Sequence, residues 1–150
     1  MVRQLFVPGL VAAAIMQGCA APAPRYSMPA SPACSQGNCS LQIKVTDCSR
    51  SDGYSVSVPS LPVHGPSRIE WTIDTPDYSF RQDVKGIDIP WGSGVFDEPK
   101  PIGHKKFSWR DKHADAGAQF KAGEIYYYFI NIKKDGGPDC TQFDPWISNW

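Results

Sequence analysis

Short stretches of alternating apolar and polar residues, separated by turn-forming residues, constrain the fold of this chain more than any other feature. Residues 40–46 read SLQIKVT, which places Leu41, Ile43 and Val45 on one face of a strand. Similar patterns recur at 54–58, 69–74, 78–82, 86–89, 106–110 and 146–148. The chain has 13 Gly and 14 Pro among 150 residues, which indicates many turns, and no segment has a convincing amphipathic helical pattern.

The strongest strand signal is residues 125–132, which read IYYYFINI. Their β-branched and aromatic side chains favour a strand, and apolar residues on both faces predict a central position in a sheet. Seven or eight such strands joined by turns predict an all-β domain. The simplest arrangement is an antiparallel two-sheet sandwich of the immunoglobulin-like or cupredoxin-like kind.

The N-terminus has the features of an export signal. Arg3 precedes an apolar stretch of 12 residues, 5–16, which is too short for a bilayer-spanning helix. The sequence MQGCA at 16–20 is similar to a bacterial lipobox, which predicts a signal peptide over 1–18 and a lipid on Cys19. The alternative is an ordinary signal peptide cleaved near residues 20–23. Ala20 is not the acidic residue that retains lipoproteins at the inner membrane, so the resemblance implies the outer membrane, facing the periplasm or the cell surface.

Residues 19–38 after this site are rich in Pro, Ala and Ser and contain few large apolar side chains. Such a composition predicts an extended tether, followed by a β-sandwich domain over 39–150. The four remaining cysteines, Cys34, Cys39, Cys48 and Cys140, form an even set in an exported chain, which predicts two disulfides. Of three possible connectivities, the one that closes the local Cys34–Cys39 loop leaves Cys48 to join Cys140.

The charge balance excludes some function classes. The chain has 15 basic and 15 acidic residues, so no net field attracts nucleic acid or an anionic membrane. The basic and aromatic stretch 105–112 is interpreted as an amphipathic strand, with Phe107 and Trp109 on one face and cations on the other. His64, His104 and His113 show no metal-ligand spacing, and we expect no cofactor.

Three carboxylates are the candidates for catalysis. Asp97, Glu98 and Asp144 could act as general acid and base or as ligands of a divalent cation. Their sequence context, Asp-Glu-Pro and Asp-Pro, has a simpler explanation, because carboxylates cap turns and proline fixes the backbone there.

Tryptophan is abundant, with five in the chain. Trp71 and Trp109 fit buried strand positions, whereas Trp91, Trp146 and Trp150 are expected in turns or at the terminus. Exposed aromatic residues anchor protein or sugar ligands, although they also cover the open ends of sandwiches. The candidate binding residues are Trp91, Phe96, Asp97, Glu98 and Trp146.

Three segments resemble the bacterial DP-EP family: FDEP at 96–99, IEWTI at 69–73 followed by Gly86-Ile87, and FDPWISN at 143–149. The resemblance covers about residues 40–149. The family has no characterised function, so the resemblance implies a compact β-rich unit and no catalytic residues.

Together these features predict a membrane-anchored, non-catalytic envelope lipoprotein that binds a protein or a glycan. An inhibitor or immunity protein is one form of this hypothesis. The alternative is a metal-dependent or acid/base hydrolase that uses Asp97, Glu98 and Asp144.

Overall fold

The computed structural model describes Cys34 and residues 37–150, and this part of the chain is built mostly from β-strands. In chain order the strands are β1 (Gly37–Val45), β2 (Tyr54–Val56), β3 (Ser60–Val63), β4 (Ser67–Ile73), β5 (Tyr78–Phe80), β6 (Ile87–Asp88), β7 (Phe96–Ile102), β8 (Lys106–Asp111), β9 (Ile125–Tyr127), β10 (Phe129–Ile130), β11 (Ile132–Lys134) and β12 (Trp146–Asn149). The 3-10 elements are η1 (Ser51–Gly53) and η2 (His113–Gln119). The predicted all-β class is confirmed.

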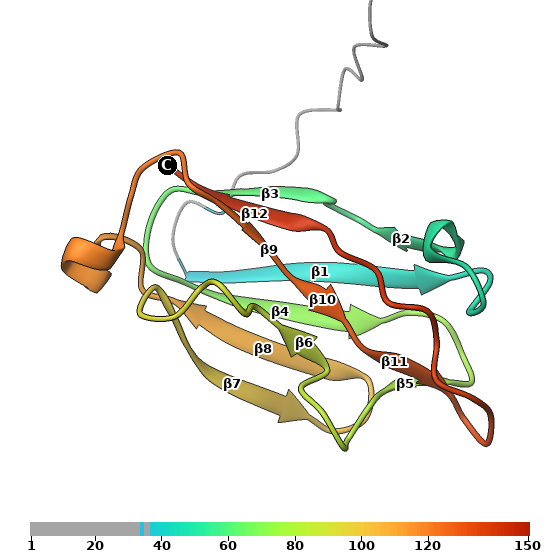
Figure 1. Ribbon diagram of the computed structural model, residues 1–150. Helices are drawn as coiled ribbons and strands as arrows, with labels where there is room; N and C mark the ends of the chain where they lie inside the picture. Colours follow the sequence, from blue (N-terminus) through green and yellow to red (C-terminus); the bar gives the residue numbers. More distant parts are fainter. Residues whose placement is uncertain (1–33, 35–36) are drawn as a thin grey trace, which may run out of the picture.

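One layer is a five-stranded sheet with the order β2-β1-β4-β8-β7 (Figure 1). Most neighbours in it are antiparallel, but β1 and β4 are parallel, with Leu41 opposite Trp71. β3 and β12 are also parallel. The prediction of purely antiparallel sheets is therefore wrong. An alternating pattern places side chains on two faces but does not specify the direction of the neighbouring strand, and the β1–β4 pair needs a crossover, which passes through β3.

The other layer consists of three small sheets, β3-β12-β9, β10-β6 and β11-β5, which face the five-stranded sheet (Figure 1). Aromatic contacts connect the two layers. The rings of Trp71 and Tyr128 lie 5.2 Å apart, and those of Phe80 and Phe107 lie 6.0 Å apart, both in edge-to-face geometry. Such pairs add about 0.5–1.5 kcal/mol beyond burial of their surface.

The core lies between the layers and follows the predicted alternation. Leu41, Ile43 and Val45 are all buried, as are Trp71 and Trp109. The largest side chains that are almost completely buried are Trp71, Tyr128, Phe80, Leu41, Ile43, Leu61, Ile69, Ile87, Ile130, Ile132, Ile147 and Val63.

Residues 125–134 form one extended run that changes its hydrogen-bonding partner twice. β9 pairs with β12, β10 with β6, and β11 with β5. Ile125 and Tyr127 are exposed, at 51% and 48%. The prediction of a single strand covered on both faces is wrong, because only the even-numbered side chains point into the core.

Two strands, β3 and β7, lie outside the segments that the sequence predicted as strands. β3 contains Pro62, and β7 contains Pro99 and Pro101. Both are edge strands, where proline is tolerated because no neighbour needs its missing N–H. A β-bulge between Asp97 and Lys100 shifts the register of β7 against β8. Proline and Asp-Glu in this segment therefore mark an irregular edge strand rather than a turn.

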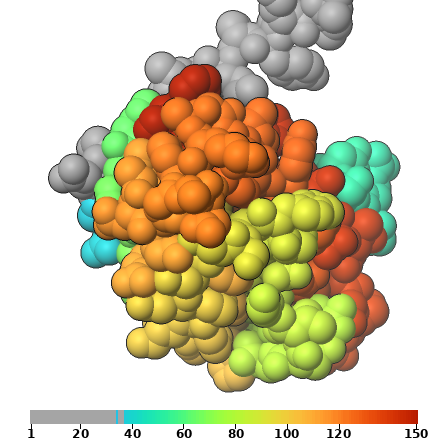
Figure 2. Space-filling view, turned by 60° about the vertical axis from the view of Figure 1, so that its left-hand side comes forward, coloured from blue at the N-terminus to red at the C-terminus, as the bar shows by residue number. Residues whose placement is uncertain are grey.

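The segment after β8 packs beside the turn that precedes β7. Lys112 N–H donates to the Val95 carbonyl at 2.9 Å. A Cβ on Gly94, whose φ is +90°, would lie 2.7 Å from Gln119 Cγ. These two segments, orange and yellow, adjoin on one face of the molecule (Figure 2).

Both expected disulfides are present. Cys34 is bonded to Cys39, and Cys48 is bonded to Cys140, 92 residues further along the chain. The first disulfide holds the start of the described chain to β1. Cys34 also makes backbone hydrogen bonds with Pro62 of β3 and with His64, which directly follows β3. The second joins the loop after β1 to the segment before β12.

The predicted signal peptide, Cys19 and most of the tether lie outside the residues that the structure describes. Within the described residues, no helix has the length and hydrophobicity needed to cross a bilayer.

Candidate functional site

The structure does not bring the predicted binding residues together in one site. Trp91 is 68% exposed, on a turn after β6 that the Gly92 N–H closes by donating to the Ile89 carbonyl. Phe96 is buried, at 4% exposure, and packs against Tyr126 with ring centroids 5.1 Å apart. The assignment of Phe96 to a binding surface is therefore wrong. It is the first residue of β7, and its side chain points into the core.

Asp97 and Glu98 belong to an ion-pair network on the outer face of the five-stranded sheet. Arg110 donates two hydrogen bonds of 2.7 Å to the Asp97 carboxylate, which lowers the pKa of Asp97. Glu98 accepts from Arg68 at 2.6 Å and lies 3.3 Å from Arg110. Because these side chains are largely solvated, each pair contributes at most about 1 kcal/mol to stability.

Glu98 has a left-handed backbone, with φ of 52°. It lies within the β-bulge, and its carboxylate reaches both Arg68 and Arg110. The bulge thus changes the direction in which the Glu98 side chain points, compared with the same position in a regular strand. The network has a simple structural role, which is to fasten the irregular edge strand to β8 and β4.

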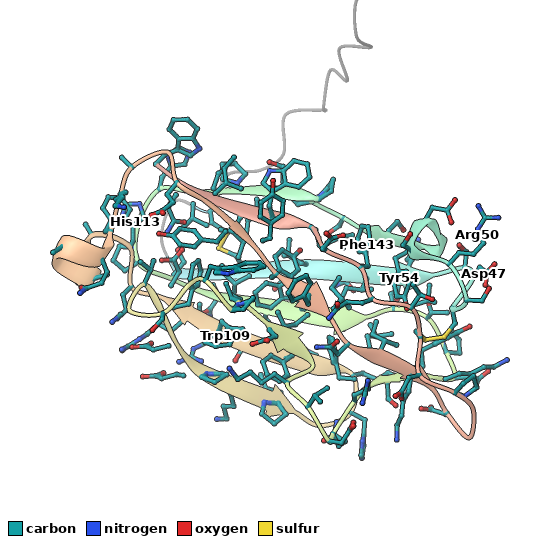
Figure 3. The ribbon with its side chains drawn as sticks, viewed as in Figure 1. Asp47, Arg50, Tyr54, Trp109, His113 and Phe143 are labelled. Atoms are coloured by element: carbon teal, nitrogen blue, oxygen red, sulfur yellow. A yellow bond between two sulfur atoms is a disulfide. The ribbon has the colours of Figure 1, made fainter. Side chains whose placement is uncertain are left out.

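Asp144 is far from the other two carboxylates. Its neighbour Phe143 stacks on Tyr54 of β2, with ring centroids 5.7 Å apart. β2 and β7 are the opposite edges of the five-stranded sheet, four strand spacings apart, or about 19 Å. Figure 3 shows Tyr54 and Phe143 at one end of the molecule and His113, which follows β8, at the other. Asp97, Glu98 and Asp144 therefore do not share a site.

The histidines are also dispersed. His64 and His104 are exposed, and His113 is buried at 7% exposure with its Nε2 2.8 Å from the Trp150 carbonyl. Over the residues that can be described, no three His, Cys, Asp or Glu side chains are grouped closely enough to hold a metal ion.

The basic and aromatic stretch forms β8, an amphipathic strand as predicted. Phe107 and Trp109 are buried, and the Trp109 indole N–H donates to the Ile87 carbonyl at 2.9 Å. On the outer face, Lys106 pairs with Glu70 at 3.0 Å and Arg110 pairs with Asp97. The cations are thus matched by carboxylates on neighbouring strands.

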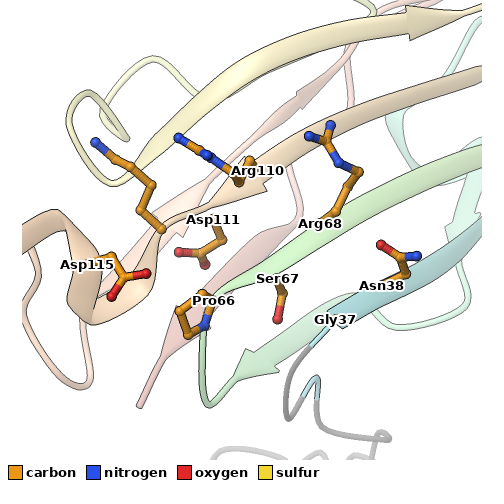
Figure 4. A pocket seen from close by; sticks show the side chains of 9 residues that line it. Gly37, Asn38, Pro66, Ser67, Arg68, Arg110, Asp111 and Asp115 are labelled. Atoms are coloured by element: carbon orange, nitrogen blue, oxygen red, sulfur yellow. The ribbon is translucent and has the colours of Figure 1, made fainter.

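A hollow of about 520 Å³ opens where β4 begins and β8 ends (Figure 4). It is lined by Gly37, Asn38, Pro66, Ser67, Arg68, Arg110, Asp111, Lys112 and Asp115. Asp111 is completely buried at its base. Its Oδ1 accepts from the His113 N–H at 2.7 Å and from Asn149 Nδ2 at 3.4 Å, while Oδ2 has no partner among the described atoms.

Burial raises the pKa of Asp111 to about 6, although its hydrogen bonds oppose the shift. The unpaired oxygen is enclosed, so a ligand in the hollow cannot contact it without rearrangement. We therefore assign Asp111 an effect on pH-dependent stability and no binding role.

Five aromatic side chains gather on the solvent-facing side of the short-strand layer. They are Trp91, Tyr127, Phe129, Trp146 and Trp150, and we call this surface the aromatic face. The rings of Trp91 and Phe129 lie 5.8 Å apart, and those of Tyr127 and Trp146 lie 6.4 Å apart. Tyr127 and Phe129 are two residues apart on one extended run, so both point outward.

Trp150 extends the aromatic face at its other end. Its indole N–H donates to Ser148 Oγ at 3.2 Å, and Ser148 lies opposite Ile125 in the pairing of β12 with β9. Trp150 remains 58% exposed. All three tryptophans expected in turns or at the terminus therefore lie on one face, although the sequence places Trp91 far from Trp146 and Trp150.

Sequence reasoning missed Tyr127 and Phe129 as surface residues. The available signal was the period of two in 125–133: odd-numbered residues point outward and even-numbered residues are buried. Uniform hydrophobicity concealed this alternation. The polar residues Asn131 and Lys133 indicate that the odd-numbered side chains face solvent.

No family model matches the chain, and no curated protein matches it either.

Proposed function

We propose that this protein is a non-catalytic lipoprotein of the bacterial envelope that binds a protein or glycan partner through its aromatic face. The observation that carries the proposal is the gathering of five aromatic side chains on one solvent-facing surface, where Trp91 joins Tyr127, Phe129, Trp146 and Trp150 from a distant part of the sequence. Burying one exposed aromatic ring in a complex contributes about 2–3 kcal/mol. Several rings must therefore bind together, because association itself costs about 4–15 kcal/mol.

The disulfides support an exported protein, because such bonds persist in oxidising compartments such as the periplasm. The proposed anchor is a lipid on Cys19, with signal peptide cleavage before it and the outer membrane as destination. A tether of 14 residues, 20–33, reaches about 43 Å when extended as polyproline II. This length allows the domain to reach partners near the membrane surface while it stays anchored.

The proposed architecture is a two-sheet sandwich of the immunoglobulin-like or cupredoxin-like kind, within the DP-EP family that the sequence resembles. The two facing layers and their interleaved aromatic contacts support the sandwich. An inhibitor or immunity protein remains one form of the proposal, because a tethered domain held by two disulfides suits that role. No observation favours the hydrolase, because Asp144 lies far from Asp97 and Glu98.

Two experiments test this function. The first expresses the full chain in a bacterium and follows its lipid labelling and membrane fractionation. We expect Cys19→Ala to abolish the label and release the protein from the membrane fraction. Unchanged labelling would exclude Cys19 as the lipidated residue.

The second experiment measures binding of the soluble domain, residues 34–150, with disulfides intact, to isolated envelopes. Trp91→Ala and Tyr127→Ala should each weaken saturable binding. Ile102→Ala is the matched control, because Ile102 is a partly exposed apolar residue on β7, in the opposite layer. Equal binding by all variants would contradict a role for the aromatic face.

A further inference from the structure

Tyr127 and Phe129 of the aromatic face belong to a single extended segment. Residues 125–133 alternate strictly between outward odd positions and buried even positions. The outward side chains are Ile125, Tyr127, Phe129, Asn131 and Lys133. Four steps of two residues span about 27 Å. The segment therefore offers a long, shallow platform.

The exposed rings on this platform are held by neighbouring rings. Phe129 is half-buried and meets Trp91 at an interplanar angle of 66°. Trp146 is half-buried and meets Tyr127 at 59°. In each pair, the less exposed ring supports the more exposed one. Rings supported in this way lose less conformational freedom when a ligand binds, which lowers the cost of association.

Neutral hydrogen-bonding groups continue the platform beyond the rings. Asn131 donates to the Lys85 carbonyl at 2.8 Å, and its Oδ1 accepts from Gln142 Nε2 at 3.2 Å. Gln142 is exposed, so its remaining amide atoms face solvent. The charge of Asp88 on β6 is paired with Lys85, at 3.3 Å. Lys133 is the last outward residue of the segment.

We infer that the partner is a polysaccharide of low charge, bound in an extended form along residues 125–131. This inference rests on the proposed function and names its ligand. Sugar rings have an apolar C–H face and a rim of hydroxyl groups. The apolar face stacks on Trp91 and Tyr127, and the hydroxyl groups bond to Asn131 and Gln142. Protein-binding hot spots differ, because they favour enclosed, fully desolvated pockets rather than rings standing on a flat sheet.

The test measures co-sedimentation of the soluble domain, residues 34–150, with chitin, cellulose and purified peptidoglycan sacculi. We expect saturable binding to at least one of these polymers. Trp91→Ala and Tyr127→Ala should each weaken that binding at least tenfold, while Ile102→Ala should remain within twofold of the wild type. Binding should persist in 0.5 M NaCl, because stacking is not screened by salt as ion pairing is. Urea denaturation of each variant establishes that it is folded.

Three results would overturn the inference: no binding to any polymer, equal binding by all variants, or loss of binding in 0.5 M NaCl. To separate this failure from failure of the proposed function, a photo-reactive residue replaces Ile125, which is exposed beside Tyr127 but makes no proposed sugar contact, in the membrane-anchored chain. If the polymers do not bind but this chain crosslinks to one protein, the polysaccharide is wrong and the binding function stands. If neither binding nor crosslinking occurs, both are wrong.

Discussion

Replacing Asp111 with asparagine should change the pH dependence of stability in a defined direction. Asp111 is completely buried, and its pKa is raised from 3.8 to about 6 because burial disfavours the charged carboxylate. The folded state therefore binds this proton more tightly than the unfolded state. Well below pH 3.8 Asp111 is protonated in both states, so its burial does not lower the free energy of unfolding. The loss of stability grows between pH 4 and 6 and is complete above about pH 7.

The size of this effect follows from the shift. A difference of about 2 pKa units corresponds to about 3 kcal/mol of destabilisation at pH 7.5. At pH 4.5, where the carboxyl is mostly ionised in the unfolded state but still protonated in the folded state, the destabilisation is about 1 kcal/mol. Asparagine retains an oxygen that accepts from the His113 N–H and from Asn149, but it carries no charge. The advantage of Asp111→Asn over the wild type should therefore be about 2 kcal/mol larger at pH 7.5 than at pH 4.5.

The assay is urea unfolding of both proteins at several pH values between 4 and 8, followed by tryptophan fluorescence. The difference in the free energy of unfolding between the two proteins is analysed, because the contributions of the other carboxylates cancel in it. Asp83→Asn is a matched control, because Asp83 is exposed and its pKa is lowered by hydrogen bonding to Arg81. If the stability curves of Asp111→Asn and the wild type stay parallel across this range, the assigned pKa shift is wrong.

Three further predictions concern stability, and urea denaturation checks each of them, with an unchanged m-value expected for the Trp71, Trp91 and Arg110 variants. Replacing Cys48 and Cys140 with alanine should cost about 5 kcal/mol and replacing Cys34 and Cys39 about 2, because loop-closure entropy grows with loop length; equal losses would contradict this. Trp71→Ala should cost about 3–5 kcal/mol, since Trp71 is completely buried, whereas Trp91→Ala should cost less than about 1; a similar loss in both would show that Trp91 is not a surface residue. Arg110→Ala removes contacts to Asp97 and Glu98 but should cost less than about 1 kcal/mol, because the pairs are solvated, and a loss of 3 would show that the network stabilises the fold substantially.

Local patterns predicted the buried side of most strands well. Leu41, Ile43 and Val45 alternate with polar residues, and their burial follows directly from that period. Trp71 and Trp109 were predicted in the core for the same reason. The disulfide pairing could be favoured from the short Cys34–Cys39 loop alone. Each of these features depends on neighbouring residues in the sequence or on the number and spacing of the cysteines.

The direction of strand pairing and the make-up of the surface depend on contacts between distant residues. Nothing in residues 37–45 indicates that β1 pairs in parallel with β4. The sequence predicted Phe96 as a binding residue beside two carboxylates, but its position in β7 points it toward Tyr126. Trp91 is far from Trp146 and Trp150 in the chain, and only the packing of β6, β9, β10 and β12 brings them to one face.

The most direct test of the aromatic face is an NMR titration that observes the five indole N–H groups separately. The isotope-labelled domain, residues 34–150, is titrated with soluble fragments of the polysaccharide that it retains, or with the crosslinked partner if that is a protein. We predict that the resonances of Trp91, Trp146 and Trp150 shift on binding, while those of the buried Trp71 and Trp109 do not. Binding that leaves the first three resonances unchanged would contradict the account.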